Sequence, residues 1–304
     1  MNGYALFWGC TIPARFPFME KSMRSVLNIL DVDYQDLDGF SCCPEKSLVK
    51  NFNPALWELA AARNVSLAER AGLNILTPCN GCYGSLKGIS SRLRTFPIEA
   101  DRVNEALAPL DLAFHGSARV EHLIEFFHDQ LGLGKIRAKV VFPLRGMRLA
   151  VHGGCHLTRP SNAIHFDDPI KPAKFDALVA ALGAESVDYP TKSICCGGYL
   201  SRVGMQELNL TMAGEKLKEL TELGVDALTT CCPECFKIFD SFQPLMQKKG
   251  AEVSVPVLTI SELAALAFGV APEELGLKDH RVDVSPFLQK FEAIRRELTD
   301  ELGL

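Results

Sequence analysis

The chain of 304 residues contains eleven cysteines, and ten of them follow one pattern that occurs twice. Each copy has a single cysteine, then an adjacent pair, then a Cys-x-x-Cys motif. The first copy is Cys10, Cys42, Cys43, Cys79 and Cys82, and the second is Cys155, Cys195, Cys196, Cys232 and Cys235. Cys195 follows Cys42 by 153 positions, and Cys235 follows Cys82 by the same offset. This repetition at a fixed offset indicates an internal duplication.

Thiolates at such spacings are typical of metal centres. Four thiolates per half would suit a zinc ion or an ordinary cubane cluster. Five per half is unusual and points to an uncommon iron–sulfur centre. A framework of structural disulfides is a weaker reading, because such chains are normally shorter and carry a secretion signal.

Composition excludes several functional classes. The net charge of −5 disfavours general nucleic-acid binding. The N-terminus lacks the basic region and long apolar run of a signal peptide, and no apolar stretch approaches the ~20 residues of a membrane span. We therefore expect a cytoplasmic protein without membrane insertion, in a reducing compartment that favours metal binding by cysteine.

Hydrophobic periodicity predicts alternating strands and helices in both halves. The first half has predicted strands at 4–8, 31–38, 72–77 and 112–115, and helices at 19–30, 54–71 and 120–131. The second half has predicted strands at 147–152, 186–189, 225–230 and 253–258, and helices at 172–182, 205–223, 235–249 and 260–268. A further amphipathic helix is expected at 286–302.

This alternation predicts an α/β fold with parallel sheets joined by right-handed crossovers. We expect two duplicated Rossmann-like domains, related by a pseudo-twofold axis, at 1–146 and 147–270, followed by a C-terminal helical extension at 271–304. Every cysteine group comes directly after a predicted strand. Since ligands collect at the carboxyl ends of parallel strands, the cysteines of each half should converge at one sheet edge.

The motifs Cys42-Cys43-Pro44, Cys195-Cys196-Gly197 and Cys79-Asn80-Gly81-Cys82-Tyr83-Gly84 resemble the cysteine-rich (CCG) domains in the B subunit of heterodisulfide reductase. The resemblance covers roughly residues 3–270. It implies two non-cubane [4Fe–4S] clusters, each bound by the five cysteines of one copy. It also implies a disulfide substrate that lies between the two clusters, which in methanogens is the mixed disulfide of coenzyme M and coenzyme B. The implied partners are the flavin-containing A subunit, together with the iron–sulfur C subunit.

Several alternatives remain open at this stage. A bacterial relative would act on a protein disulfide, and related domains occur as electron-transfer subunits of glycolate, lactate and succinate-type oxidoreductases. The absence of a ferredoxin run such as C-x-x-C-x-x-C favours a terminal catalytic role. A structural zinc protein would leave the fifth thiol of each half unexplained. No Gly-x-Gly-x-x-Gly fingerprint stands in a strand–helix context, so no bound nucleotide is expected.

Five further residues have separate predictions. Cys231, which stands where the first half has Pro78, is either a spare buried thiol or an alternative ligand. His152 and His156 flank Cys155, and His156 is our candidate for the catalytic proton donor because histidine titrates near neutral pH. Arg15 and Arg159 follow the single cysteines closely, and we expect them to bind an anionic substrate or to be surface arginines.

Overall fold

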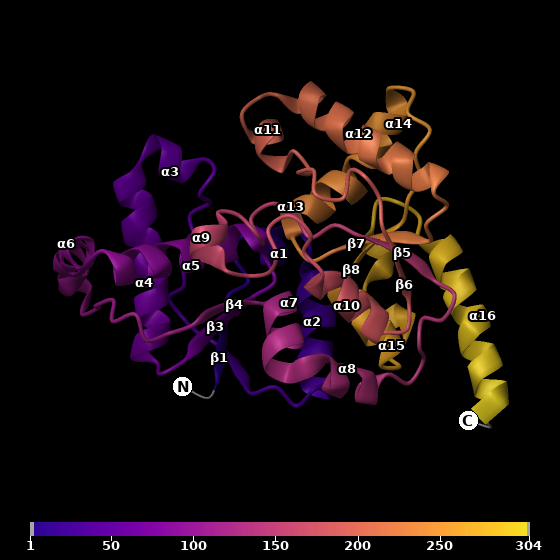
Figure 1. Cartoon of the computed structure of the whole chain (residues 1–304), viewed down its shortest axis with the longest axis horizontal. Coiled ribbons are helices and arrows are strands. Elements are labelled where there is room, and N and C mark those ends of the chain that lie inside the picture. The colour runs from indigo at the N-terminus through magenta and orange to yellow at the C-terminus, as the bar shows by residue number, and fades with distance from the viewer. Residues whose placement is uncertain (1–2, 303–304) are drawn as a thin grey trace. The chain divides into compact units, whose positions relative to one another are not determined.

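The computed structural model describes residues 3–302, and within them the chain forms two four-stranded sheets in which all strands are parallel (Figure 1). The first sheet has the order β2-β1-β3-β4 and the second the order β6-β5-β7-β8. Equivalent registers occur in both, since Ala5 pairs with Ile75 and Ala150 pairs with Leu228. The strands are β1 Tyr4–Leu6, β2 Tyr34–Asp36, β3 Asn74–Thr77, β4 Val120–His122, β5 Arg148–Val151, β6 Glu185–Val187, β7 Ala227–Thr230 and β8 Val257–Thr259.

Helices connect the strands, as the sequence pattern predicts. The longer ones are α2 Pro17–Ile29, α4 Pro54–Arg70, α5 Asn80–Thr95, α6 Pro97–Leu107, α10 Lys174–Ala181, α12 Gln206–Glu222, α15 Ile260–Ala267 and α16 Ser285–Leu302. Shorter helices are α1 Thr11–Arg15, α3 Val49–Phe52, α7 Leu123–Glu125, α8 Leu133–Lys139, α9 Ser161–Ile164, α11 Gly198–Arg202, α13 Pro233–Phe236 and α14 Gln243–Lys248. Two π-helical segments, Phe126–Gly132 and Lys237–Ser241, replace parts of expected α-helices. Three 3-10 turns are Ala108–Leu110, Pro272–Glu274 and Leu277–Asp279.

The predicted fourth strand of the first half, at 112–115, is wrong. The strand is Val120–His122, within the stretch for which a helix was expected. Side chains rather than a sheet satisfy the backbone of the earlier segment. The Asn104 amide binds both the N–H and the C=O of Phe114, and the Glu69 carboxylate accepts the N–H groups of His115, Ser117 and Ala118. Because side chains already pair the backbone groups of this segment, it does not require hydrogen bonds to a neighbouring strand.

The chain divides into two compact units, each assembled from three stretches. Unit 1 consists of the residues up to 14, 32–126 and 155–172, and unit 2 consists of 15–31, 127–154 and 173 onward. The stretch after β1 therefore belongs to unit 2, where α2 packs on α15 and the Ser22 and Ser261 hydroxyls lie 2.9 Å apart. The stretch after β5 belongs to unit 1, where α9 packs on α5. This division is not collinear with the duplication, whose sequence boundaries remain a prediction.

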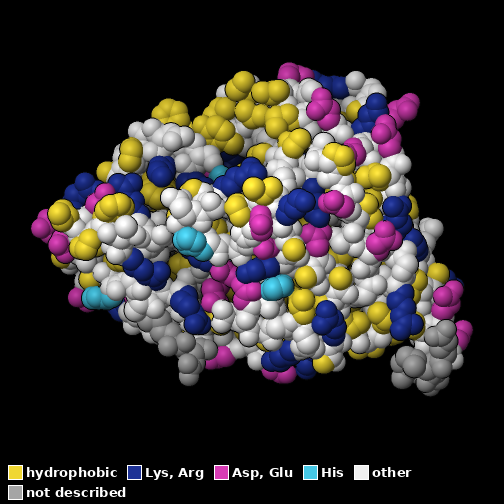
Figure 2. Space-filling model, viewed as in Figure 1, with side chains coloured by type: hydrophobic (Ala, Val, Ile, Leu, Met, Phe, Trp, Pro, Cys, Tyr) yellow, Lys and Arg dark blue, Asp and Glu magenta, His cyan; other side chains and the backbone are white. Residues whose placement is uncertain are grey.

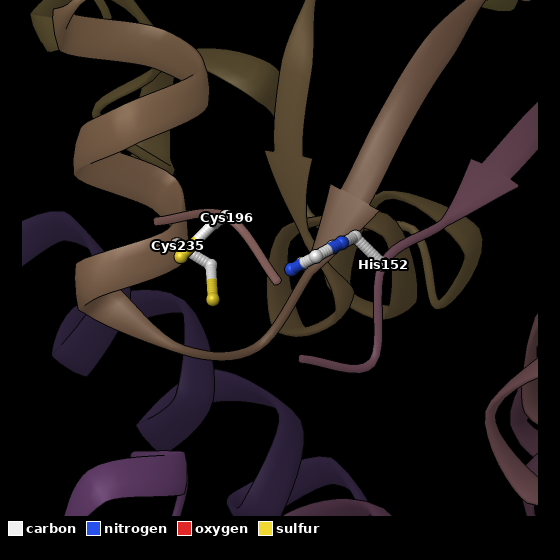
Figure 3. A group of neighbouring side chains, drawn as sticks. All are labelled: His152, Cys196 and Cys235. Atoms are coloured by element: carbon white, nitrogen blue, oxygen red, sulfur yellow. The ribbon is translucent and has the colours of Figure 1, made fainter. Parts of the chain in front are cut away.

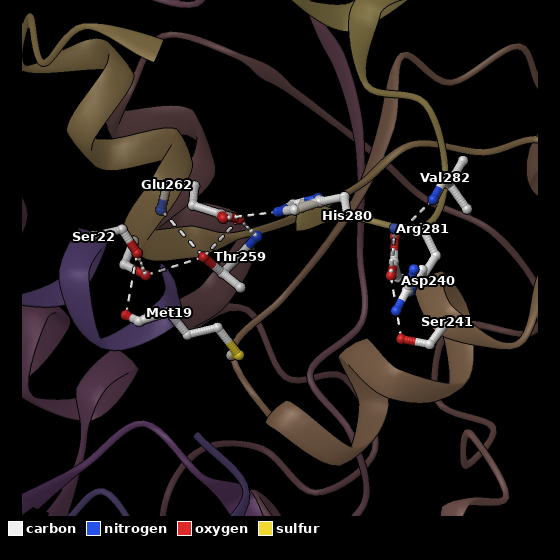
Figure 4. A network of polar contacts seen from close by, with 10 residues as sticks. Met19, Ser22, Asp240, Ser241, Thr259, Glu262, His280, Arg281 and Val282 are labelled. Atoms are coloured by element: carbon white, nitrogen blue, oxygen red, sulfur yellow. Dashed lines mark hydrogen bonds and ion pairs between the residues drawn. The ribbon is translucent and has the colours of Figure 1, made fainter. Parts of the chain in front are cut away.

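The C-terminal extension is part of unit 2 and binds it through buried polar contacts (Figure 4). The His280 ring lies 2.9 Å from the Glu262 carboxylate, and both side chains are fully buried. The Asp240 carboxylate accepts the backbone N–H groups of Arg281 and Val282. In α16, Phe287 and Phe291 are buried. Specific contacts thus fix the extension in place.

Large hydrophobic side chains gather on the surface over α11 and the start of α12, as Figure 2 shows. The exposed ones in α12 and in the turn between the two helices, all in unit 2, include Val203, Met205 and Leu208. Among the described residues, no helix combines the length and the apolar character needed to cross a bilayer.

Candidate metal centre

Unit 1 brings all five cysteines of the first copy together. Cys10 follows β1, Cys42 and Cys43 follow β2, and Cys79 directly precedes α5, whose first turn contains Cys82. The Cys42 thiol is hydrogen-bonded to Cys10 and Cys43, Cys43 in turn to Cys82, and Cys82 to Cys79. Strands β1 and β3 are neighbours at the point where the strand order reverses, the usual ligand-binding position of such sheets. The predicted convergence of these five thiols is therefore confirmed.

The closeness of these thiols changes their acidity. Hydrogen bonds from Cys42 and Cys82 lower the pKa of the Cys43 thiol below its ordinary value. The hydrogen bond to Cys43, reinforced by burial, raises the pKa of Cys82 well above its ordinary value. One negative charge is thus stable in the group while further ionisation is opposed. A metal centre removes that opposition because its positive charge compensates several thiolates.

Gly9 makes room for this group. Its φ is +69°, and a Cβ added there would lie 2.7 Å from the Cys82 Sγ. Any larger residue would displace Cys82 or the loop before Cys10, and the left-handed backbone also favours glycine.

The second copy forms a matching group in unit 2. Cys196 is hydrogen-bonded to Cys195 and Cys235, and Cys235 also to Cys232. Hydrogen bonds to Cys196 and Cys232, together with burial, raise the pKa of Cys235 well above its ordinary value. The fifth member, Cys155, belongs to unit 1. Four of the five expected thiols therefore lie together within one unit.

Cys231 is buried in unit 2 beside this group. Burial and the neighbouring charge of Cys232 raise the pKa of Cys231 well above its ordinary value. Cys235 shares hydrogen bonds with Cys196 and Cys232. The assignment of Cys231 as a spare thiol stays a prediction.

The donor set fits iron–sulfur clusters. All eleven cysteines are free thiols and none forms a disulfide. Soft sulfur donors gathered from three strand ends are the ligands that iron–sulfur clusters use. The ten predicted ligands remain a proposal at the level of individual residues.

His156 lies in unit 1 against the loop that follows Cys43. Its Nε2 lies 2.9 Å from the Ser47 hydroxyl, and its Nδ1 lies 3.6 Å from a Glu45 carboxylate oxygen. The same carboxylate accepts the backbone N–H groups of Ser47 and Leu48, which fixes the loop. The sequence placed His156 only beside Cys155, whereas the structure also brings it to the loop that follows the first cysteine pair.

A lysine lies near a predicted cysteine ligand, in addition to the two arginines that the sequence analysis considered. Arg15, the last residue of α1, and Arg159 are both exposed. Lys46, which the sequence analysis did not single out, donates a hydrogen bond of 2.8 Å to the Arg159 carbonyl. Burial lowers the pKa of Lys46 to about 8, although the charge of Cys155 opposes that effect. Its position three residues after Cys43 was the only signal in the sequence.

Comparison with known proteins agrees with this arrangement. The model of the CCG cysteine-rich domain family matches residues 4–87 and 149–240. A protein of Methanosarcina mazei, the B subunit of ferredoxin:CoB-CoM heterodisulfide reductase, is 38% identical over 301 residues, which cover 98% of this chain and 100% of that protein. The chain belongs to the family of heterodisulfide reductase B subunits. Its cysteine-rich domains carry the clustered cysteines of iron–sulfur proteins, and its relatives are oxidoreductase subunits.

Two further similarities support the family and the fold. In Methanosarcina acetivorans, the B subunit of the ferredoxin/F(420)H(2)-dependent CoB-CoM heterodisulfide reductase is 40% identical over 292 residues, or 95% of this chain and 97% of that protein. The crystal structure of a hypothetical protein from Helicobacter pylori superposes with a TM-score of 0.69 at 17% identity, covering 93% of this chain and 52% of that chain. The latter similarity shows the fold alone.

This member of the heterodisulfide reductase family has a second site that sequence reasoning described incompletely. His152, the residue directly after β5, lies fully buried beside Cys196 and Cys235 (Figure 3). Lys216 from α12 is buried with it, 3.2 Å from the His152 Nδ1. The position of His152 near Cys155 was visible in the sequence. Only Cys232 and Cys235 of its group lie fewer than 20 residues from Lys216 in the sequence. The spacing therefore did not indicate that Lys216 belongs to this site.

Proposed function

We propose that the chain is the component of a heterodisulfide reductase that reduces the disulfide substrate. The proposed substrate is the mixed disulfide of coenzyme M and coenzyme B, named for the two Methanosarcina relatives. The observation that carries the proposal is the group of five hydrogen-bonded thiols at the strand ends of unit 1, repeated by four thiols of unit 2.

The ten cysteines are the proposed ligands of two non-cubane [4Fe–4S] clusters. Reduction of one disulfide to two thiols requires two electrons and two protons, and two clusters held by these cysteines would supply the electrons one at a time. This requirement gives a physical reason for the duplication, because neither sulfur is then left as a free thiyl radical. The first cluster would use Cys10, Cys42, Cys43, Cys79 and Cys82, and the second Cys155, Cys195, Cys196, Cys232 and Cys235.

The protein's own groups provide the remaining steps. His156 is the proposed proton donor to a departing thiolate, with its ring oriented by the Ser47 hydroxyl and the Glu45 carboxylate. Arg15 and Arg159 are the proposed contacts for the anionic groups of the substrate, and Lys46 adds a third cation beside Arg159. Electrons would arrive from a flavin-containing A subunit, together with an iron–sulfur C subunit.

Metal and sulfide analysis under anaerobic conditions tests the proposal. We expect about eight irons per chain, four in each of two clusters, with matching acid-labile sulfide. Cys43→Ala should remove the first cluster and Cys196→Ala the second. Turnover of the coenzyme M–coenzyme B disulfide with an artificial reductant should require both clusters. Zinc without sulfide, or full turnover in a chain that lacks one cluster, contradicts the proposal.

A further inference from the structure

His152 occupies a fixed position at the second cysteine group. Its backbone N–H extends the sheet by donating to the Thr229 carbonyl at 2.8 Å. Its ring packs edge-to-face on Phe239, with centroids 4.7 Å apart. One ring nitrogen and the Sγ atoms of Cys196 and Cys235 lie within 4.8 Å of one another. Figure 3 shows that the outer end of the ring, which carries Nε2, points toward these thiols.

Lys216 determines which ring nitrogen carries the proton. Its Nζ lies 3.0 Å from the Ile194 carbonyl, 3.2 Å from the Lys192 carbonyl and 3.2 Å from the His152 Nδ1. Three acceptors around one amine match the three N–H groups of an ammonium, which has no acceptor of its own. Nδ1 of His152 therefore accepts a hydrogen bond.

A neutral ring that accepts at Nδ1 carries its proton on Nε2. Because Nδ1 accepts the hydrogen bond from Lys216, it carries no proton, and the ring is neutral. The Nε2 atom is fully buried and has no hydrogen-bond partner among residues 3–302. An unpaired buried N–H is costly, and the thiols of Cys196 and Cys235, which lie within 4.8 Å of a ring nitrogen, offer the acceptor it lacks.

The first cysteine group differs at this position. Phe7 donates its backbone N–H to the Leu76 carbonyl at 2.9 Å, just as His152 donates to Thr229, and Leu76 and Thr229 are related by the offset of the duplication. The Phe7 ring packs on Phe40 and has no N–H to donate. The His152–Lys216 pair is therefore a difference between two otherwise equivalent sites.

We propose that His152, oriented by Lys216, donates an N–H hydrogen bond to sulfur at the second cysteine group and raises the reduction potential of the cluster bound there. The inference rests on the proposed function, since it requires a cluster. A hydrogen-bond donor and a buried cation both stabilise the reduced cluster, which carries one more negative charge. Lys216 acts through His152 and is a positioning residue. The arrangement also argues against His152 as an iron ligand, because ligation through Nε2 would require Nδ1 to donate a proton to an acceptor.

Redox titration of the intact, cluster-loaded chain, followed by electron paramagnetic resonance, tests this inference. The two cluster signals are assigned with Cys43→Ala and Cys196→Ala. His152→Phe copies the first site, and Lys216→Met removes the cation. Both should shift the midpoint of the second cluster to a more negative potential and leave the first unchanged. His152→Gln keeps an N–H donor, and it should therefore shift the midpoint potential less than His152→Phe does. Lys192→Met is the matched control, because that side chain pairs with Asp176, and it should leave both midpoints unchanged.

Histidine labelled with ¹⁵N supplies a readout that does not depend on activity. Electron–nuclear double resonance on the signal of the second cluster should show a weak hyperfine coupling to a nitrogen. The His152→Phe substitution should abolish this coupling. Unchanged midpoints in both variants, or a strong coupling typical of direct iron ligation, would overturn the inference. Loss of iron in His152→Phe, with iron retained in the other His152 and Lys216 variants, would also overturn the inference. A wild-type chain without iron or sulfide would instead contradict the proposed function itself.

Discussion

At the residue scale, the thiols within each group are not equivalent. Cys43 and Cys82 share a hydrogen bond, yet the pKa of Cys43 is lowered and that of Cys82 is raised. Cys231 and Cys232 are adjacent and both buried, and Cys232 is hydrogen-bonded to Cys235. The thiols of one group therefore differ in acidity as well as in their position in the sequence.

The adjacent pair offers a direct comparison. Cys232→Ala should remove the second cluster and with it about four of the eight irons. Cys231→Ala should retain all of them, because a small buried residue is replaced by one of similar shape. Iron and sulfide content of the two variants is the measurement. Equal iron loss in both would show that the register of ligands in the second copy is wrong by one residue.

His156 can be separated from the cysteine that precedes it. His156→Ala should lower kcat by a factor of about 10²–10⁴, the usual contribution of a general acid, with KM and iron content unchanged. Ser47→Ala removes one orienting contact and should lower kcat less. Steady-state kinetics with an artificial reductant measure both variants. Unchanged kcat in His156→Ala would end the proton-donor role and leave the cluster proposal intact.

At the element scale, the junctions from strand to helix build the site. Parallel strands deliver Cys10, Cys43 and Cys79 to one edge of the first sheet, and glycine lets the chain turn there. Gly9 and Gly72 have nearly the same positive φ, +69° and +70°, but only Gly9 faces a thiol. A Cβ at Gly72 would have no atom within 4 Å.

These two glycines form a matched pair for mutation. Each alanine variant should cost about 1–2 kcal/mol of stability through the left-handed backbone. Only Gly9→Ala should also lower the iron content of the first cluster, because its Cβ would collide with the Cys82 Sγ. Iron analysis and urea unfolding of Gly9→Ala and Gly72→Ala distinguish the two effects. Full iron content in Gly9→Ala would show that the loop shifts freely.

At the scale of the whole molecule, the two units exchange segments. Unit 2 contains α2 from the first half of the sequence, and unit 1 contains α9 from the second. The C-terminal extension completes unit 2 through the buried His280–Glu262 pair and the backbone contacts of Asp240. Folding of each unit therefore requires residues from both halves of the duplication.

The His280–Glu262 pair makes unit 2 sensitive to pH. Burial disfavours the charged ring, but the charge and hydrogen bond of Glu262 outweigh it and raise the pKa of His280 above its ordinary 6.5. This stabilisation is fully present below the unfolded pKa and is lost as pH rises through the folded pKa. Glu262→Gln should lower the free energy of unfolding by roughly 1.5–3 kcal/mol at pH 6 and by less at pH 9.

Urea unfolding at several pH values is the measurement. Lys290→Ala, which breaks a partly exposed ion pair with Asp226 in the same unit, should change stability by less than about 1 kcal/mol at every pH. A loss in Glu262→Gln that grows with rising pH would contradict the assignment of charge to His280.

Much of this protein could be predicted from spacing and periodicity. The fixed offset of the cysteines identified the duplication, and strand–helix alternation required parallel sheets, whose carboxyl ends bring the first five thiols together. These conclusions need only local pattern and sheet geometry. The fourth strand of the first sheet did not follow from pattern, because side chains outside the expected segment, Asn104 and the more distant Glu69, pair its backbone.

Other features depended on contacts between distant segments. The placement of His156 against Ser47, of Lys46 against Arg159 and of Lys216 against His152 joins residues 64 to 113 positions apart. No periodicity records such pairs, since hydrogen bonds between distant side chains depend on where helices pack. The same packing gave unit 1 the stretch after β5 and unit 2 the stretch after β1. Local pattern thus selects the elements and the ligand types, and tertiary packing selects the polar groups that surround them.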